Sequence, residues 1–331
     1  MKNNIIGISL GGVHMIFIFL IIGFIFLIKG ADFFVEGTSS MAKKFNVPSM
    51  IIGLTIVAMG TSAPEAAVSI VSSLAGQNDI SVANVVGSNF FNILVVLGIS
   101  SILSTLPVKK NTIKKDTPLL IISCILLLLF SLNSNISRIE GVAFLICFTY
   151  FLVITIKSTK DTDNELVTEA ATTAEAELEM IKDISIFKTI LISAVGIIGV
   201  VCGGDMVVDC ATKIATSLGM SANLIGLTIV AVGTSLPELV TSVVATKKGE
   251  TEIAIGNIIG SNIFNILLII GLASTITPLT ISRFSLIDII FMTIITVLLY
   301  LFIKKSNSLT KIHGYIFILL YIGYMTYTMM R

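Results

Sequence analysis

A block of fourteen residues occurs twice in this chain, and this internal duplication constrains the fold more than any other feature of the sequence. Residues 52–65 read IGLTIVAMGTSAPE and residues 225–238 read IGLTIVAVGTSLPE, so twelve of the fourteen positions are identical at an offset of 173. Each copy places a glutamate directly after a proline inside an otherwise apolar run. Helix packing alone does not require this pairing, so the duplication predicts one site built from two halves.

The composition indicates an integral membrane protein. The 331 residues are 55% hydrophobic and 12% charged, whereas soluble domains average about 25% charged residues. Apolar runs of about 20 residues, the length that crosses a bilayer as a helix, recur along the whole chain. The period-2 alternation of a membrane barrel is absent, so an all-α membrane protein is expected. The net charge of +1 does not favour a nucleic-acid partner.

The hydropathy pattern predicts ten transmembrane helices in two groups of five. The expected spans are residues 14–43, 49–76, 80–103, 117–132, 139–157, 186–217, 222–247, 252–275, 284–303 and 312–330. The segment between the two groups, residues 158–185, carries eight acidic residues and cannot cross a bilayer, so it is interpreted as a solvated, partly helical linker. The linker separates a first five-helix repeat, residues 1–157, from a second, residues 186–331.

The duplication extends beyond the opening block at the same offset. Residues 84–94 read NVVGSNFFNIL and residues 257–267 read NIIGSNIFNIL, and Asp32 in the first half corresponds to Asp205 in the second. Because each half holds an odd number of spans, the second half must enter the membrane from the opposite side. The halves are therefore predicted to be inverted repeats, an arrangement typical of secondary transporters.

The placement of basic residues predicts the orientation in the membrane. With the N-terminus outside, fifteen of the twenty-one Lys and Arg residues fall on the cytoplasmic side. By the positive-inside rule, both termini are predicted to be extracellular and the acidic linker cytoplasmic, in a multi-pass protein of the cell membrane.

The proline of each copy, Pro64 or Pro237, is predicted to break its helix and to free the carbonyl four residues earlier, because proline lacks an N–H group. Glu65 and Glu238 follow these breaks inside apolar segments. An ionised carboxylate at the bilayer centre costs at least about 2.5–3.5 kcal/mol, and two facing carboxylates need a cation to remain ionised together. The pair therefore predicts a site for a metal ion.

The neighbours of both glutamates are oxygen donors, which indicates the class of ion. These neighbours are Thr61, Ser62, Asn84, Ser88 and Asn92 in the first half and Thr234, Ser235, Asn257, Ser261 and Asn265 in the second. Neither Cys nor His enters the repeated blocks, although soft transition metals usually recruit them. Carboxylate, hydroxyl, amide and carbonyl oxygens suit hard cations such as Ca²⁺.

Two alternatives stay open from the residues alone. Any single Ser or Asn of these blocks could serve close helix packing, as small polar residues often do in membranes. Lys29, Asp32 and Glu36 share one face of the first helix, and they mark either an ion path or an internally paired cluster near the membrane edge.

The doubled motifs resemble the alpha repeats of a known family. Residues 60–65 and 233–238 both read GTSxPE, and residues 87–92 and 260–265 both read GSNxFN. In these motifs the chain resembles the cation/calcium exchanger superfamily, and within it the prokaryotic type of the sodium/calcium exchanger branch. The resemblance implies ten helices in two inverted repeats, with the first and sixth helices sliding against the other eight. Proton-coupled relatives usually carry a GNxxE-type motif in place of GTSxPE, so sodium is favoured as the counter-ion.

The resemblance also implies roles for individual residues. Calcium would be held by the carboxylates of Glu65 and Glu238 with the backbone oxygens of Thr61 and Thr234. The implied sodium ligands are the same glutamates, the hydroxyls of Ser62, Ser88, Ser235 and Ser261 and the carbonyls of Ala58 and Ala231, with Asn92 and Asn265 lining the centre. Some family members carry an aspartate at the position of Asn265, and asparagine there leaves two carboxylates and disfavours potassium co-transport.

These observations predict an electrogenic antiporter that exchanges Na⁺ for Ca²⁺ by alternating access. Its expected partners are these two ions and the lipid bilayer, with no resident cofactor and with a monomer as the working expectation. The alternatives are a proton/calcium antiporter that uses the same carboxylates, a cation channel and an intramembrane enzyme. An enzyme is disfavoured because both histidines, His14 and His313, lie outside the repeated blocks and no nucleophile–base pair is evident.

Overall fold

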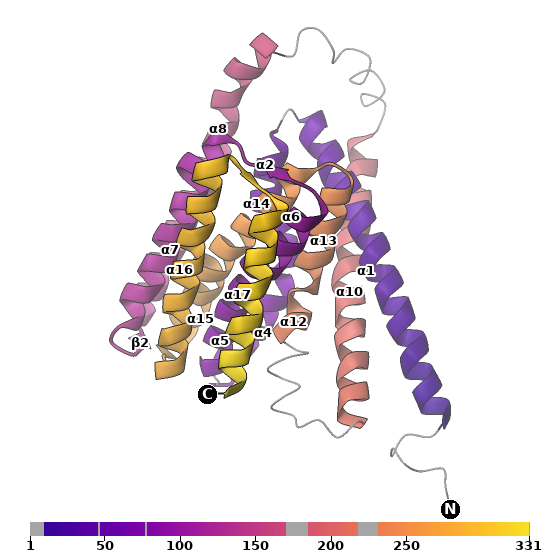
Figure 1. Cartoon of the computed structure of the whole chain (residues 1–331), viewed down its shortest axis with the longest axis vertical. Coiled ribbons are helices and arrows are strands. Elements are labelled where there is room, and N and C mark those ends of the chain that lie inside the picture. The colour runs from indigo at the N-terminus through magenta and orange to yellow at the C-terminus, as the bar shows by residue number, and fades with distance from the viewer. Residues whose placement is uncertain (1–9, 46, 77, 170–184, 218–230, 331) are drawn as a thin grey trace, which may run out of the picture.

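The chain forms a bundle of long helices in a computed structural model that describes residues 10–45, 47–76, 78–169, 185–217 and 231–330 (Figure 1). The helices of the first half are α1 (Leu10–Lys44), α2 (Ser49–Ile52), α3 (Ala58–Thr61), α4 (Ala63–Leu74), α5 (Asn78–Phe91), α6 (Leu97–Leu103), α7 (Thr117–Ser131) and α8 (Arg138–Glu169). Those of the second half are α10 (Ile186–Ser217), α12 (Ala231–Thr234), α13 (Leu236–Lys247), α14 (Thr251–Ile263), α15 (Gly271–Ile276), α16 (Arg283–Ser306) and α17 (Lys311–Met330).

Each of the ten predicted spans coincides with one or more of these helices. In the seventh span the helix is described from Ala231 onward, and its earlier part lies outside the described residues. Within the described ranges, six helices are long and apolar enough to cross a membrane, and the pair Ser49–Thr61 and Ala63–Leu74, bent by 49°, is a further candidate span. The all-α membrane fold predicted from the sequence is therefore confirmed.

The fifth helix is longer than predicted. The expected span ended at residue 157, but α8 continues through Glu169 into the acidic linker. Residues 158–169 contain neither Gly nor Pro, so nothing in the local sequence stops the helix where the apolar run ends. The rest of the linker, from 170 to 184, lies outside the described residues.

Several spans in the centre of the bundle are interrupted rather than continuous. Short π-helical turns, η1 (Gly53–Val57), η2 (Asn92–Val96) and η5 (Phe264–Ile270), join the helical pieces of the second, third and eighth spans. In such turns the backbone hydrogen bonds skip one additional residue, and they are frequent at functional sites. The segments Ser81–Leu103 and Thr251–Ile276 are largely buried, so α5, α14 and the π-helical turns that follow them form the core of the bundle.

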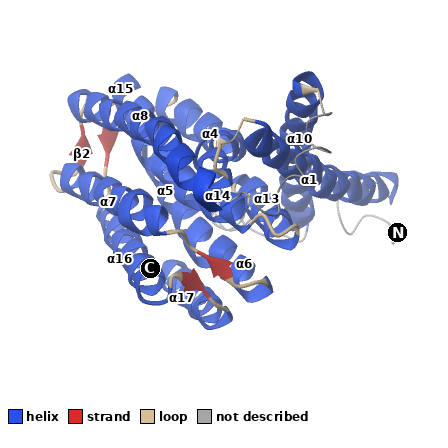
Figure 2. Ribbon diagram, turned by 90° about the horizontal axis from the view of Figure 1, so that it is seen from above, coloured by secondary structure: helices blue, strands red, loops and turns tan. Residues whose placement is uncertain are grey.

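α1 and α10 form a separate pair at one side of the bundle (Figures 1 and 2). They approach closely because glycine lies at their contact: a Cβ atom on Gly30 would be 2.6 Å from the amide nitrogen of Val200. The outward faces of both helices carry exposed apolar side chains such as Ile21 and Ile198, as expected for contact with lipid.

Two short β-ribbons connect the halves of the chain. Leu106 of β1 (Leu106–Pro107) pairs with Leu309 of β4 (Ser308–Leu309), and Ile136 of β2 (Asn135–Ile136) pairs with Leu279 of β3 (Leu279–Thr280). Residues 106 and 279 are 173 positions apart, as are 136 and 309, so the ribbons are equivalent features of the two repeats. These ribbons were not predicted from the sequence.

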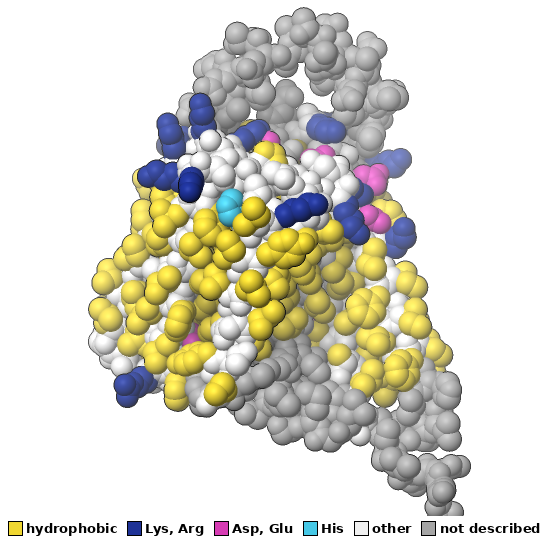
Figure 3. Space-filling view, in the orientation of Figure 1, with side chains coloured by type: hydrophobic (Ala, Val, Ile, Leu, Met, Phe, Trp, Pro, Cys, Tyr) yellow, Lys and Arg dark blue, Asp and Glu magenta, His cyan; other side chains and the backbone are white. Residues whose placement is uncertain are grey.

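Basic side chains gather at one end of the molecule, above a broad apolar belt (Figure 3). We call this the lysine-rich end; it includes Lys43 at the end of α1 and Lys305 at the end of α16. The start of α1 and the end of α17 lie at the opposite end (Figure 1).

Candidate cation site

Glu65 and Glu238, at equivalent positions of the two repeats, each lie in the first turn of a helix that starts after a break. Ser62 and Ser235 precede the new helices with φ/ψ angles of −83°/10° and −92°/8°, and α4 and α13 begin at the next residue. Proline occupies the second position of each new helix, where a missing N–H group costs little because the first N–H groups of a helix have no partner within it. The same free N–H groups and the positive end of the helix dipole favour a carboxylate in this turn.

At the first break, the Ser62 amide donates to the Ala58 carbonyl at 3.0 Å and also lies near the Gly60 carbonyl, the one that Pro64 was predicted to free. The Ala58 carbonyl also accepts a long bond of 3.5 Å from the Ser261 hydroxyl of the other repeat. Ala231, its counterpart, is the first residue of α12.

The hydrogen bonds of the glutamates cross from one repeat to the other. The Ser62 hydroxyl donates to Oε1 of Glu238 at 2.8 Å, and the Ser235 hydroxyl donates to Oε1 of Glu65 at 2.9 Å. Both carboxylates and both serines are fully buried. The GTSxPE blocks therefore meet in one place, as the duplication predicted.

A helix of the same repeat, α5 for Glu65 and α14 for Glu238, adds a further hydroxyl to each carboxylate. Ser88 donates to Oε1 of Glu65 at 3.3 Å, and Ser261 donates to Oε1 of Glu238 at 3.5 Å. These bonds are longer than those from the other repeat. In each carboxylate, all of these serine hydroxyls contact the same oxygen.

Four buried side-chain oxygens of the predicted ligands have no hydrogen-bond partner. They are Oε2 of Glu65, Oε2 of Glu238, Oδ1 of Asn92 and Oδ1 of Asn265. The ion pairs found in the described part of the chain involve neither glutamate. Buried carboxylates without a basic partner are costly, so a proton or a cation is needed to compensate them. Two carboxylate and two amide oxygens, related by the repeat, are a donor set that suits a hard cation.

The amides of Asn92 and Asn265 are oriented by a second pair of asparagines that the sequence analysis did not single out. Asn92 Nδ2 donates to Oδ1 of Asn262 at 3.0 Å, and Asn265 Nδ2 donates to Oδ1 of Asn89 at 3.0 Å. Asn89 and Asn262 in turn donate to each other's main-chain oxygens at 3.3 and 3.5 Å. With both amide nitrogens engaged in this way, the Oδ1 atoms of Asn92 and Asn265 are left unpaired. Asparagine occurs at both of these equivalent positions, and this match between the repeats was the signal in the sequence that could have identified them.

An outer layer of polar residues joins the same helices. The Thr61 hydroxyl donates to Asn257 Oδ1 at 3.0 Å, and the Thr234 hydroxyl lies 3.5 Å from Asn84 Oδ1. Asn84 Nδ2 also donates to the Ser69 hydroxyl at 2.9 Å. The structure thus brings together the predicted residues of both repeats. Their hydroxyls and amides cross-link the repeats as well as surround the glutamates.

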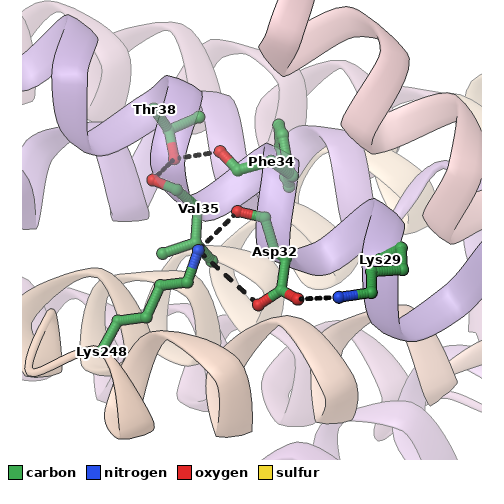
Figure 4. Close-up of polar contacts among 6 residues, drawn as sticks. All are labelled: Lys29, Asp32, Phe34, Val35, Thr38 and Lys248. Atoms are coloured by element: carbon green, nitrogen blue, oxygen red, sulfur yellow. Dashed lines mark hydrogen bonds and ion pairs between the residues drawn. The ribbon is translucent and has the colours of Figure 1, made fainter.

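The polar face of α1 lies apart from these residues and is ion-paired. Asp32 is 3.7 Å from the ammonium of Lys29 and 3.6 Å from that of Lys248 on the loop after α13 (Figure 4). Of the two interpretations of this face, the paired cluster agrees with the structure, although Lys248 comes from the other repeat.

Comparison with known proteins extends these findings over nearly the whole chain. The model of the sodium/calcium exchanger protein family matches residues 15–157 and 188–330. CaxA of Alkalimonas amylolytica, a candidate antiporter, is 40% identical over 314 residues, which cover 93% of this chain and 96% of CaxA. The sodium/calcium exchanger MaX1 of Methanosarcina acetivorans is 31% identical over 345 residues, covering 93% of this chain and 97% of MaX1.

Solved structures show the same fold. A structure of the sodium–calcium exchanger NCX_Mj, soaked without Na⁺ and Ca²⁺, superimposes with a TM-score of 0.81 at 33% identity and covers 94% of this chain and 97% of its own. Other structures of NCX_Mj were obtained after soaks with Na⁺ and with Ca²⁺ or Sr²⁺.

Proposed function

This chain belongs to the sodium/calcium exchanger protein family, and on that premise we propose that it exchanges Na⁺ for Ca²⁺ across a membrane by alternating access. The family makes it a transporter and not an enzyme. The observation that carries the proposal is the set of four unpaired, buried oxygens on Glu65, Glu238, Asn92 and Asn265. Two come from each repeat, so both halves of the molecule are required to complete the site.

Ca²⁺ would be held by the carboxylates of Glu65 and Glu238 with the backbone oxygens of Thr61 and Thr234. Na⁺ would use the same glutamates, the hydroxyls of Ser62, Ser88, Ser235 and Ser261, the carbonyls of Ala58 and Ala231, and the side chains of Asn92 and Asn265. The crossed serine bonds support the inclusion of the hydroxyls, because each hydroxyl already faces a carboxylate and could turn its oxygen to a cation. Ca²⁺ accepts about 6–8 oxygen ligands in flexible geometry, and the candidate set is large enough to supply them.

Exchange is proposed to be electrogenic. The two carboxylates balance one Ca²⁺, whereas more than two Na⁺ would leave the loaded site positively charged. Moving one elementary charge through 100 mV corresponds to about 2.3 kcal/mol, so the membrane potential would bias the direction of exchange.

The proposed orientation places both termini outside the cell and the linker at residues 158–185 in the cytoplasm, between repeats at residues 1–157 and 186–331. The support is the gathering of basic residues at the lysine-rich end, away from the start of α1 and the end of α17. We propose in addition that this multi-pass protein lies in the cell membrane and works as a monomer.

Gradient-driven flux in proteoliposomes tests the proposal. Ca²⁺ uptake is expected when the vesicles are loaded with Na⁺ and diluted into Na⁺-free buffer, and Glu65→Gln or Glu238→Gln should abolish it. Thr326→Val is the matched control, because that hydroxyl bonds only the Ile322 carbonyl on an exposed face of α17. Its uptake should equal that of the unaltered protein.

The same vesicles distinguish the alternatives. Uptake driven by a pH gradient and not by Na⁺ would assign the protein as a proton/calcium antiporter that uses the same carboxylates. Single-channel currents would assign it as a channel. Absence of Ca²⁺ flux under any of these gradients would refute the proposed cargo.

A further inference from the structure

Polar contacts join α1 to the loop between α13 and α14 at the lysine-rich end. The Lys248 ammonium lies 3.6 Å from Oδ1 of Asp32 and donates to the Asp32 main-chain oxygen at 2.8 Å (Figure 4). Seven residues further along α1, the Ser39 hydroxyl donates to Oε1 of Glu250. We call these four residues, Asp32, Ser39, Lys248 and Glu250, the latch.

The latch lies where the separate pair of helices meets the rest of the bundle. Beside it, Phe34 and Val35 of α1 belong to one buried apolar cluster with Val244 and Ala245 of α13. At the opposite end, in the described parts of the two helices, α10 makes no comparable contact with α4. The structure therefore shows a state in which the pair is docked at the lysine-rich end.

The repeat offers a direct comparison for the latch. At the offset of 173, Asp32 corresponds to Asp205 and Ser39 to Thr212, but Lys248 corresponds to Ala75 and Glu250 to Gln77. The acidic residue on the long helix is thus present in both halves. Its basic partner is present in only one.

The backbone geometry is the same at position 248 and at its counterpart, position 75, although only position 248 carries a lysine. Lys248 directly follows α13 with φ/ψ angles of −81°/−1°, and Ala75 directly follows α4 with angles of −80°/1°. Each is followed by a glycine of positive φ, 81° at Gly249 and 73° at Gly76. A lysine at position 75 would therefore leave its helix in the same direction as Lys248 does.

We propose that the latch biases this protein towards the state that is docked at the lysine-rich end. In a transporter with inverted repeats, the state that opens to the other side of the membrane is related to this one by swapping the two repeats. In that state α10 would dock against α4, as α1 docks here against α13. There Asp205 would meet Ala75 and gain no ion pair. An interaction available in only one of two states shifts the equilibrium towards that state. The inference rests on the alternating access proposed above, but not on which ions are exchanged.

The size of the bias follows from the exposure of the pair. The side chains of Lys248 and Asp32 are 34% and 32% exposed, and ion pairs at such positions usually change an equilibrium by about 1.4- to 5-fold. High salt should screen the pair and reduce the bias. The latch therefore tunes the balance between the two states without preventing exchange.

Hydrogen–deuterium exchange of the purified protein, without Ca²⁺, tests the proposal. The variants are Lys248→Ala, Ala75→Lys and the double variant that carries both substitutions. Lys248→Ala should speed exchange in peptides that cover 35–44 and, at the same time, slow it in peptides that cover 68–76. Ala75→Lys should shift both sets of peptides in the same directions as Lys248→Ala. The double variant should show the largest shift, because it moves the latch to the other end.

Leu74→Lys is the matched control, since it adds the same charge to the exposed end of α4 at the counterpart of Lys247, which has no part in the latch. It should leave both sets of peptides unchanged. The proposal is overturned if Lys248→Ala alters only the peptides at the lysine-rich end, if no variant alters either set, or if Leu74→Lys reproduces Ala75→Lys. None of these readings depends on ion flux, so failure of this inference and failure of the proposed exchange are distinguishable.

Discussion

At the scale of single residues, each of the four central side chains of the candidate site uses one polar atom for a structural contact and leaves another atom available for ligation. One oxygen of each glutamate accepts the serine bonds, from both repeats, while the other oxygen is unpaired. The same division holds for Asn92 and Asn265, whose amide nitrogens are engaged and whose oxygens are not. A buried polar atom without a partner is costly, so this arrangement supports the proposal that a cation enters and leaves the site.

Asn262→Ala should raise the half-saturating Ca²⁺ concentration about 2- to 10-fold, because Asn92 loses the acceptor that orients its amide. The maximal rate should change less. Asn89→Ala should have the same effect through Asn265. The measurement is the Ca²⁺ dependence of Na⁺-driven uptake in liposomes.

Ser274→Ala serves as the control for these variants. Ser274 is buried, but its hydroxyl bonds carbonyls of its own helix, Ile270 at 2.6 Å and Gly271 at 3.3 Å. It should leave both kinetic parameters unchanged. A loss of maximal rate with an unaltered half-saturating concentration in the asparagine variants would contradict a positioning role.

At the scale of elements, the helices divide into interrupted and continuous ones. The helices that present the site are broken at Ser62 and Ser235 or carry the π-helical turns η2 and η5, which contain Asn92 and Asn265. The long helices α1 and α10, by contrast, are continuous and pack against each other through glycine. Continuity and close packing suit a pair of helices that moves as one body.

Gly30→Ala should destabilise the α1–α10 pair, because its Cβ would lie 2.6 Å from the main-chain nitrogen of Val200, which cannot move aside cheaply. Overpacking of this kind costs about 1–3 kcal/mol, so the melting temperature in detergent should fall by several degrees. Gly323→Ala on α17 is the control, since nothing lies within 4 Å of its Cβ position. Equal melting temperatures for the two variants would show that the glycine contact is not needed.

At the scale of the whole molecule, the inverted repeat organises both the site and its supports. The two β-ribbons join each half to the other at equivalent positions, and the crossed serine and asparagine bonds do the same in the centre. The departures from symmetry are equally informative. Lys248 and Ala75 occupy equivalent helix ends, and only one of them carries a charge.

Asn133 and Ser306 provide a test of the inverted topology, because they are 173 positions apart and both are exposed at the ends of helices. In a background where Cys202 is replaced by serine, Asn133→Cys should react with a membrane-impermeant maleimide in intact cells. Ser306→Cys should react only after the cells are permeabilised. Labelling of both from one side would contradict the inversion, and the reverse order would contradict only the proposed orientation.

Much of the architecture was predictable because it depends on local patterns. Apolar runs define the spans, the odd number of spans in each copy defines the inversion, and Pro64 and Pro237 mark the breaks beside the glutamates. The length of α8 was underestimated because a helix can continue past its apolar run when no Gly or Pro stops it.

The sequence by itself determined that this protein crosses the membrane as two related halves and that two carboxylates surrounded by oxygen donors lie within the bilayer. Only the tertiary structure decided that Ser62 donates to Glu238 and that Ser235 donates to Glu65. It also decided that Asn89 and Asn262 orient the amides of Asn265 and Asn92, and that Lys248 pairs with Asp32. The reason is physical: hydropathy and helix breaks act over a few turns of one segment. Hydrogen bonds and ion pairs between residues more than 150 positions apart depend on how whole helices are placed against one another.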